Sequence, residues 1–169
     1  MRYSATCAIV ASMAVGSSAL AVGEPIAWWT FDQISGDTAI NEIPGIDGAL
    51  AAPAAMVAGG ASGGALDVRN GGWANMGLNY DLLGTAFSMQ TWIRTTDTSS
   101  NSTIIAGKHV TGTFNGYMMR INQDTASYGL PTRASFYQSN SPGSTAVGTS
   151  SVTDDEWHHL VSTYTPGGS

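Results

Sequence analysis

The densest group of chemically capable side chains lies near the C-terminus, where an acidic run meets two histidines. Residues 154–159 read Asp-Asp-Glu-Trp-His-His, and an alternating apolar pattern follows. Histidine pairs can bind zinc or exchange protons, which raises a metal or catalytic interpretation. Successive side chains of a strand point to opposite faces, however, so His158 and His159 cannot converge on one ion. We expect a structural pair, with one histidine facing inward beside Val161 and the other outward.

The acidic residues of the same run are candidates for the two carboxylates of a glycosidase. Such a pair must stand roughly 5–10 Å apart across the scissile bond. Asp154, Asp155 and Glu156 are consecutive, and a solvated acidic turn is the better interpretation. We therefore assign no catalytic role to them.

Residues 60–64 match the G-x-S-x-G pattern of a serine nucleophile elbow. That elbow needs a strand before it and a helix after it. Residues 65–68, followed by Asn-Gly-Gly at 70–72, instead read as a strand and a turn. We expect a loop at residues 60–64, and we predict no catalytic residue in the chain.

Residues 1–21 have the composition of a secretory signal peptide. Arg2 supplies a positive charge, residues 7–18 are almost wholly small and apolar, and residues 19–21 (Ala-Leu-Ala) match a cleavage site. The apolar run is too short to span a membrane comfortably. We therefore predict a mature domain at residues 22–169 with no membrane span, and a secreted or cell-surface location.

The predicted mature chain carries neither a cysteine nor an excess of positive charge. The single cysteine, Cys7, lies in the predicted leader, so stability must come from core packing rather than from an intrachain disulfide. The full chain has 6 Lys and Arg against 12 Asp and Glu, a formal net charge of −6. This balance disfavours nucleic acid and anionic lipid as partners and is compatible with neutral sugars, cationic surfaces or Ca²⁺.

Short alternating segments separated by turn residues recur along the mature chain, without a convincing helical period. Residues 86–94 alternate cleanly, with one face made of Phe87, Met89, Thr91 and Ile93. Asn115-Gly116 predicts a tight turn. Further strands are predicted at residues 26–31, 45–50, 65–68, 73–78, 103–107, 117–122, 133–138, 145–152 and 157–165. This pattern is typical of an all-β antiparallel sandwich.

Four segments carry recognisable motifs in a fixed order. They read W-W-T-F-D…S-G-D at residues 28–37, G-G-A-L-D-V at 63–68, F-S-M-Q-T-W-I at 87–93 and D-E-W-H-H-L-V at 155–161. Together they resemble the laminin-G-like, or concanavalin A-like, jelly-roll domains of secreted bacterial proteins. The resemblance implies two curved antiparallel sheets packed face to face, and binding or adhesion more often than catalysis. The E-x-D-x-x-E pattern of glucanases of this broad fold is absent.

The family usually continues beyond the equivalent of residue 169 with an L-Y-V-D-G-like hairpin. Here the sequence ends in Pro-Gly-Gly-Ser at residues 166–169. A Pro-Gly-Gly turn after a strand normally leads into a partner strand. We therefore expect a fragment whose last strands are missing, which leaves an unpaired sheet edge.

The resemblance does not identify the ligand, because known members bind sugars, proteins or Ca²⁺. Loops at residues 32–37, 67–70 and 79–81 are rich in oxygen ligands and could together hold Ca²⁺, although no EF-hand spacing is present. Ca²⁺ is therefore the cofactor that the sequence leaves open.

Trp73 is the candidate ligand-binding residue, because it follows Gly71-Gly72 and could stack its apolar face on a sugar ring. Polar edges could come from Tyr80, Tyr128 and Tyr137. Structural packing is the more common role of large aromatics in a sandwich, and we assign it to Trp29, Trp92 and Trp157.

The leading hypothesis is an exported, non-catalytic recognition module that binds a glycan or a surface protein, with Ca²⁺ as an aid that the sequence leaves open. A glycan-active hydrolase or lyase of the same fold is one alternative, and paired carboxylates facing one groove would favour it. A structural or accessory domain of a larger cell-surface protein is the other, and a domain without a pocket would favour it.

Overall fold

The computed structural model describes residues 10–12, 24–33, 36–77, 80–82, 84–99, 102–110, 115–122, 131–138 and 145–166. These residues form short strands, and the one helical segment among them is a 3-10 turn, η1 (Arg69–Gly71). Every pair of neighbouring strands whose register is given by the described residues is antiparallel. This confirms the predicted all-β antiparallel class. Within the same residues, no helix has the length and apolar character that a membrane crossing requires.

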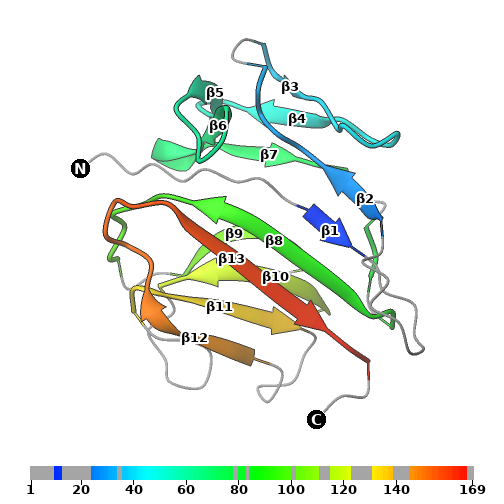
Figure 1. The fold of residues 1–169 in the computed structure, drawn as a ribbon, viewed down its shortest axis with the longest axis vertical. Helices are drawn as coiled ribbons and strands as arrows, with labels where there is room; N and C mark the ends of the chain where they lie inside the picture. The colour runs from blue at the N-terminus through cyan, green and yellow to red at the C-terminus, as the bar shows by residue number, and fades with distance from the viewer. Residues whose placement is uncertain are drawn as a thin grey trace. The chain divides into compact units, whose positions relative to one another are not determined.

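The chain divides into two compact units, and the first comprises residues 1–93 and 159–169. Its largest sheet has the strand order β13 (His158–Tyr164), β8 (Phe87–Ile93), β1 (Val10–Ser12) and β2 (Pro25–Trp28) (Figure 1). A second sheet joins β3 (Thr38–Ala39), β4 (Gly48–Ala51) and β7 (Trp73–Asn75), and a hairpin joins β5 (Ala55–Ala58) to β6 (Gly64–Asp67).

The two faces of β8 differ as the alternation predicts. The residues of one face are all buried, namely Phe87, Met89, Thr91 and Ile93. The other face carries Trp92, which is 39% exposed. Because the period of a strand is two residues, the polar and apolar positions of β8 fix which face it buries.

β13 turns Val161 to its exposed face, whereas the sequence predicts an inward position for this residue. His158 is half-buried and His159 is exposed, so the two histidines do lie on opposite faces. Val161, however, shares the face of His159 and is 57% exposed, so the expected inward position beside Val161 is wrong. The other face carries Tyr164, whose ring lies 5.5 Å from that of Phe87. A large aromatic contact therefore fixes the register of β13, and Val161 is left outside.

The second unit comprises residues 94–158. Its sheet has the order β12 (Thr145–Ser151), β11 (Arg133–Gln138), β10 (Asn115–Ile121) and β9 (Thr103–Val110). β10 pairs with both neighbours, and residues 116–122 are buried without alternation. Even Arg120 is buried, with its Nε donating to Ser135 Oγ at 3.3 Å.

The tight turn expected at Asn115-Gly116 is not there. Both residues belong to β10, where they lie opposite Val110 and His109 of β9. The turn signal fails because the β9–β10 ladder continues through the glycine, and the connection between the two strands lies outside the described residues.

The segment with the nucleophile-elbow pattern is a hairpin loop. Residues 59–63 connect β5 to β6, and the N–H of Gly60 donates to the carbonyl of Gly63 at 2.9 Å. The N–H of Gly64 donates to Asp32 Oδ1 at 2.7 Å, which anchors the start of β6. A strand follows the loop where an elbow needs a helix, so the loop interpretation is confirmed.

Candidate functional site

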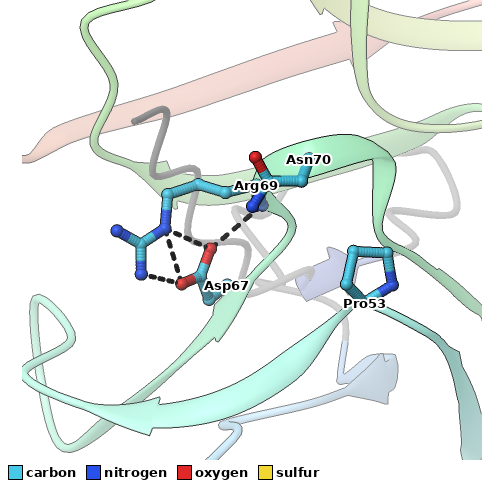
Figure 2. A pocket seen from close by; sticks show the side chains of 4 residues that line it. All are labelled: Pro53, Asp67, Arg69 and Asn70. Carbon is cyan, nitrogen blue, oxygen red and sulfur yellow. Dashed lines mark hydrogen bonds and ion pairs between the residues drawn. The ribbon is translucent and has the colours of Figure 1, made fainter. Parts of the chain in front are cut away.

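A pocket of about 220 Å³ opens in the first unit where two turns meet. Its lining consists of Pro53, Asp67, Arg69 and Asn70 (Figure 2). Pro53 comes from the turn between β4 and β5, and the other three come from the end of β6 and from η1. Asn70 adopts φ 64°, a left-handed conformation that asparagine tolerates better than most residues. The pocket is thus built by loops at strand ends.

Asp67 and Arg69 form a bidentate ion pair on the wall of the pocket. Arg69 Nε donates to Asp67 Oδ1 at 2.8 Å and to Oδ2 at 2.6 Å, and Arg69 Nη2 contacts Oδ2 (Figure 2). The backbone N–H of Arg69 also donates to Oδ1 at 3.0 Å. These bonds, chiefly that from the guanidinium, lower the pKa of Asp67 against the opposing effect of burial. Both side chains of the pair are therefore charged, but their opposite charges cancel, so this wall of the pocket carries no net charge.

Trp73 starts β7 directly beside the pocket-lining turns. A Cβ built on Gly72 would lie 2.5 Å from the backbone nitrogen of Ala54, so the turn that contains Pro53 touches the segment leading into β7. Trp73 pairs with Ala51 of β4, and its side chain is 57% exposed. The structure thus gives the predicted stacking residue a largely exposed indole, on the strand that follows the pocket-lining turn. Trp73 is not among the described residues that line the pocket.

The tyrosines expected to supply polar edges lie elsewhere. Tyr80 is half-buried, with its ring edge-on to Trp29 at 5.8 Å, and burial raises the pKa of its hydroxyl. Tyr137 is buried in β11, where the guanidinium of Arg120 lies 5.4 Å from its ring centre. Both are packing residues, because a large ring gains more from burial than from exposure. Tyr128 lies outside the described residues.

Trp92, for which we predict structural packing without a choice of sheet face, lies on the exposed face of β8 and packs across to the neighbouring strand. Its indole stacks on the imidazole of His159, with ring centres 4.9 Å apart and planes at 18°. His159 Nε2 also lies 3.0 Å from Gln90 Oε1. The alternation of β8 contained this signal, since Gln90 and Trp92 occupy the positions opposite to the buried face. Trp29, by contrast, packs in the core, where it is buried.

The acidic residues before β13 are held by separate partners. Asp154 Oδ1 lies 2.7 Å from His158 Nε2, and Asp155 accepts hydrogen bonds from Arg94 at 3.0 and 3.2 Å. These bonds lower the pKa of both carboxyls, whereas a general acid needs a raised pKa. All three acids of the run are exposed in a bend, which confirms the solvated acidic turn.

Two of the carboxylates in the loops considered for Ca²⁺ have partners within the protein. Asp32 accepts the N–H of Gly64, Asp67 holds Arg69, and Asn79 lies outside the described residues. No group of three His, Cys, Asp or Glu side chains gathers in the part of the chain that the structure describes.

The geometry of strands and loops agrees with what comparison to protein families shows. Residues 68–169 match a laminin-G-like family described as the concanavalin A-like lectin/glucanases superfamily. The match starts just before η1 and includes Asn70 and Trp73. The motif at residues 28–37 precedes it, as does the motif at residues 63–68 except for its last residue. Comparisons with curated proteins and with solved structures found no match. The antiparallel sheets and the family match together show that the chain belongs to the concanavalin A-like lectin/glucanases superfamily.

Proposed function

We propose that this protein is an exported recognition module that binds a neutral glycan at the pocket beside Trp73. Membership of the lectin/glucanases superfamily supports carbohydrate or protein binding as the class of function. The observation that carries the glycan proposal is an indole with 57% exposure at the start of β7, the strand that directly follows the turn lining a polar pocket. Such a ring can cover the apolar C–H face of a sugar while neighbouring polar groups bind its hydroxyls.

The pocket wall supplies the polar groups that a sugar hydroxyl needs. Asp67 is an ionised acceptor, and the side-chain amide of Asn70 can both donate and accept. Because sugar hydroxyls also donate and accept, both residues can be used by one ring. Pro53 adds an apolar wall that carries no competing donor.

Charge argues for a neutral glycan. The one acidic and the one basic side chain of the pocket neutralise each other in the Asp67–Arg69 pair. The whole chain carries a formal net charge of −6, which repels an anionic polysaccharide at a distance. A sulfated or uronic-acid-rich glycan would therefore gain no attraction from the pocket and would meet repulsion from the chain.

Export is part of the same proposal. The basic start, the small apolar run and the Ala-Leu-Ala site at residues 19–21 support secretion or display at the cell surface. Outside the cell the domain would meet polysaccharides directly. N-terminal sequencing of the exported protein should give Val22 as the first residue.

The proposal is tested on an array of neutral and anionic oligosaccharides, with Trp73→Ala and Trp92→Ala compared with the wild type. Trp92 is an exposed tryptophan of a different sheet and serves as the matched control. Truncating a tryptophan at the centre of a binding site typically costs about 2 kcal/mol or more, which corresponds to roughly thirtyfold in affinity. We expect neutral glycans to bind the wild type and Trp92→Ala equally and Trp73→Ala at least tenfold more weakly.

EDTA is expected to leave binding unchanged, because no group of three His, Cys, Asp or Glu side chains gathers in the described part of the chain. Failure of the folded wild type to bind any neutral glycan contradicts the proposal, and so does equal binding by Trp73→Ala. Release of reducing sugar from the bound glycans would instead support the hydrolase alternative.

A further inference from the structure

An inner strand of the four-stranded sheet of the first unit, β1, comes from the predicted leader. β1 lies between β8 and β2 and pairs antiparallel with both (Figure 1). Val10 stands opposite Trp28 on one side and Gln90 on the other. These residues belong to the segment that the proposed export removes at residues 19–21. Cleavage would therefore take a strand out of the middle of the sheet.

β2 is held in place independently of β1. On its other side, the N–H of Trp28 donates to Asn41 Oδ1 at 2.9 Å, and its carbonyl accepts the N–H of Glu42 at 2.8 Å. The next residue, Trp29, forms an isolated antiparallel β-bridge with Asn41, and its side chain is buried. β2 is therefore fixed by segments of the first unit that remain after cleavage.

The gap left by β1 is one strand wide. Neighbouring strands lie about 4.8 Å apart, so β8 and β2 stand roughly 10 Å from each other. Closing the gap would move β2 by about one strand spacing and break its bonds to Asn41 and Glu42. The unpaired N–H and C=O groups along both edges are costly to leave without partners. The gap is thus a slot that favours a new strand.

The chemistry of the slot defines what fits it. Neither β8 nor β2 carries an Asp, Glu, Lys or Arg residue. At the middle of the slot Ala11 stands between Ala27 and Met89, both of which are buried while β1 is in place. A fitting strand is therefore uncharged, extended, and small at the position of Ala11.

We propose that removal of the leader opens this slot and that it then binds an extended, uncharged strand of a second polypeptide, antiparallel to β8 and β2. Before cleavage the leader holds the slot through Val10–Ser12. Main-chain hydrogen bonds to both edges supply affinity, and the buried neighbours of the central position supply specificity. The inference rests on the proposed export but not on the proposed glycan.

The test uses the full gene expressed with export, in the wild type and in an Ala21→Phe variant that blocks cleavage at the small-residue site. The probe is a fluorescently labelled peptide with the sequence of residues 8–14, and its control carries Ala11→Pro, which cannot donate a backbone hydrogen bond. Fluorescence anisotropy should show one peptide bound per processed protein. Binding should be at least tenfold weaker for the proline peptide, and at least tenfold weaker for the uncleaved variant, whose own β1 fills the slot.

The other possible outcomes of this experiment also support or overturn the strand-binding proposal. If the processed protein is recovered unfolded, adding the peptide should restore its near-UV circular dichroism, and failure to do so overturns the proposal. Equal binding of both peptides, no binding by folded processed protein, or recovery of uncleaved wild type alone also overturns it.

The glycan array run on the same samples separates the two proposals. Glycan binding without peptide binding refutes the slot alone, and the reverse result refutes the pocket alone.

Discussion

The imidazole of His159 lies almost parallel to the indole of Trp92, so that β13 covers one face of an otherwise exposed tryptophan on β8. The Nε2 atom of the same imidazole lies 3.0 Å from Oε1 of Gln90. Stacked aromatic pairs contribute about 0.5–1.5 kcal/mol beyond the area that they bury. This contact therefore helps to fix the register between β8 and β13 on the outward face.

Replacing His159 by Ala should expose the indole of Trp92 and shift its fluorescence emission to longer wavelength. The free energy of unfolding should fall by about 0.5–1.5 kcal/mol, because the stacked contact is lost. Urea unfolding and emission spectra measure the two effects. His158→Ala is the matched control, since His158 lies on the opposite face of β13. A shift that persists when Trp92 is also replaced by Phe would contradict this assignment.

Asn122 should be the most sensitive polar residue of the second unit. It is fully buried, donates from Nδ2 to the carbonyl of Asp97 at 2.6 Å and accepts the N–H of Thr132 at 3.0 Å. Asn122→Ala leaves both backbone groups without this partner, at a cost of about 1–3 kcal/mol each. Urea denaturation should show this loss, whereas Thr149→Ala at an exposed position of β12 should change little. Equal stability of the two variants would refute the role of Asn122.

Gly64 is required by close backbone packing at the start of β6. A Cβ at this position would lie 1.9 Å from the carbonyl oxygen of Phe31, and backbone cannot move away as a flexible side chain can. Overpacking of this kind typically costs about 1–3 kcal/mol, which lowers the melting temperature of a chain of this size by roughly 2–4 °C per kcal/mol. Gly148→Ala is the control, because its nearest contact is 3.3 Å. Identical melting temperatures would show that β6 does not need the glycine.

How far the sequence predicts the fold depends on the strength of the alternation. β8 and β11 were expected almost at their observed limits, because large apolar residues alternate with polar ones in β8 and β11 lies between clear turn signals. β3 and β5 were not expected, because two residues show no period and an alanine-rich strand has little contrast between its faces. Val161 was placed on the wrong face because the Phe87–Tyr164 contact, rather than the hydropathy of Val161, sets the register of β13.

The candidate site was predictable only in part. Trp73 was identified from its glycine neighbours, because large aromatics beside turns are often exposed. The pocket itself joins Pro53 to Asp67, Arg69 and Asn70. No periodic signal connects residues that stand so far apart in the sequence. Their contact arises from the packing of Gly72 against Ala54, which becomes visible once the two turns are placed.

Glycan binding should depend on pH through Asp67. The pKa of this carboxyl is lowered in the folded protein, chiefly by the Arg69 guanidinium, so its ionised form is favoured by folding. Its stabilising contribution is present above the ordinary value of about 3.9 and is lost as pH falls through the lowered folded pKa. Binding by the wild type should therefore persist below pH ~4.

Arg69→Met should move the midpoint of this pH profile upward, because the carboxyl loses the hydrogen bonds that stabilise its charge. The affinity for the glycan selected on the array is measured from pH 3 to 7, and the midpoint is compared rather than the maximal affinity. Trp92→Ala should keep the wild-type midpoint. An unchanged or lower midpoint in Arg69→Met would contradict the role of the ion pair.

The most direct measurement of glycan stacking is tryptophan fluorescence during titration with the neutral oligosaccharide that binds best on the array. Trp73→Phe retains an apolar ring for stacking but removes the indole that reports on it. Addition of the sugar should change the emission of the wild type and of Trp92→Phe, and it should leave the emission of Trp73→Phe unchanged while calorimetry still detects binding. The same emission change in Trp73→Phe would show that the glycan binds elsewhere and would contradict the proposed site.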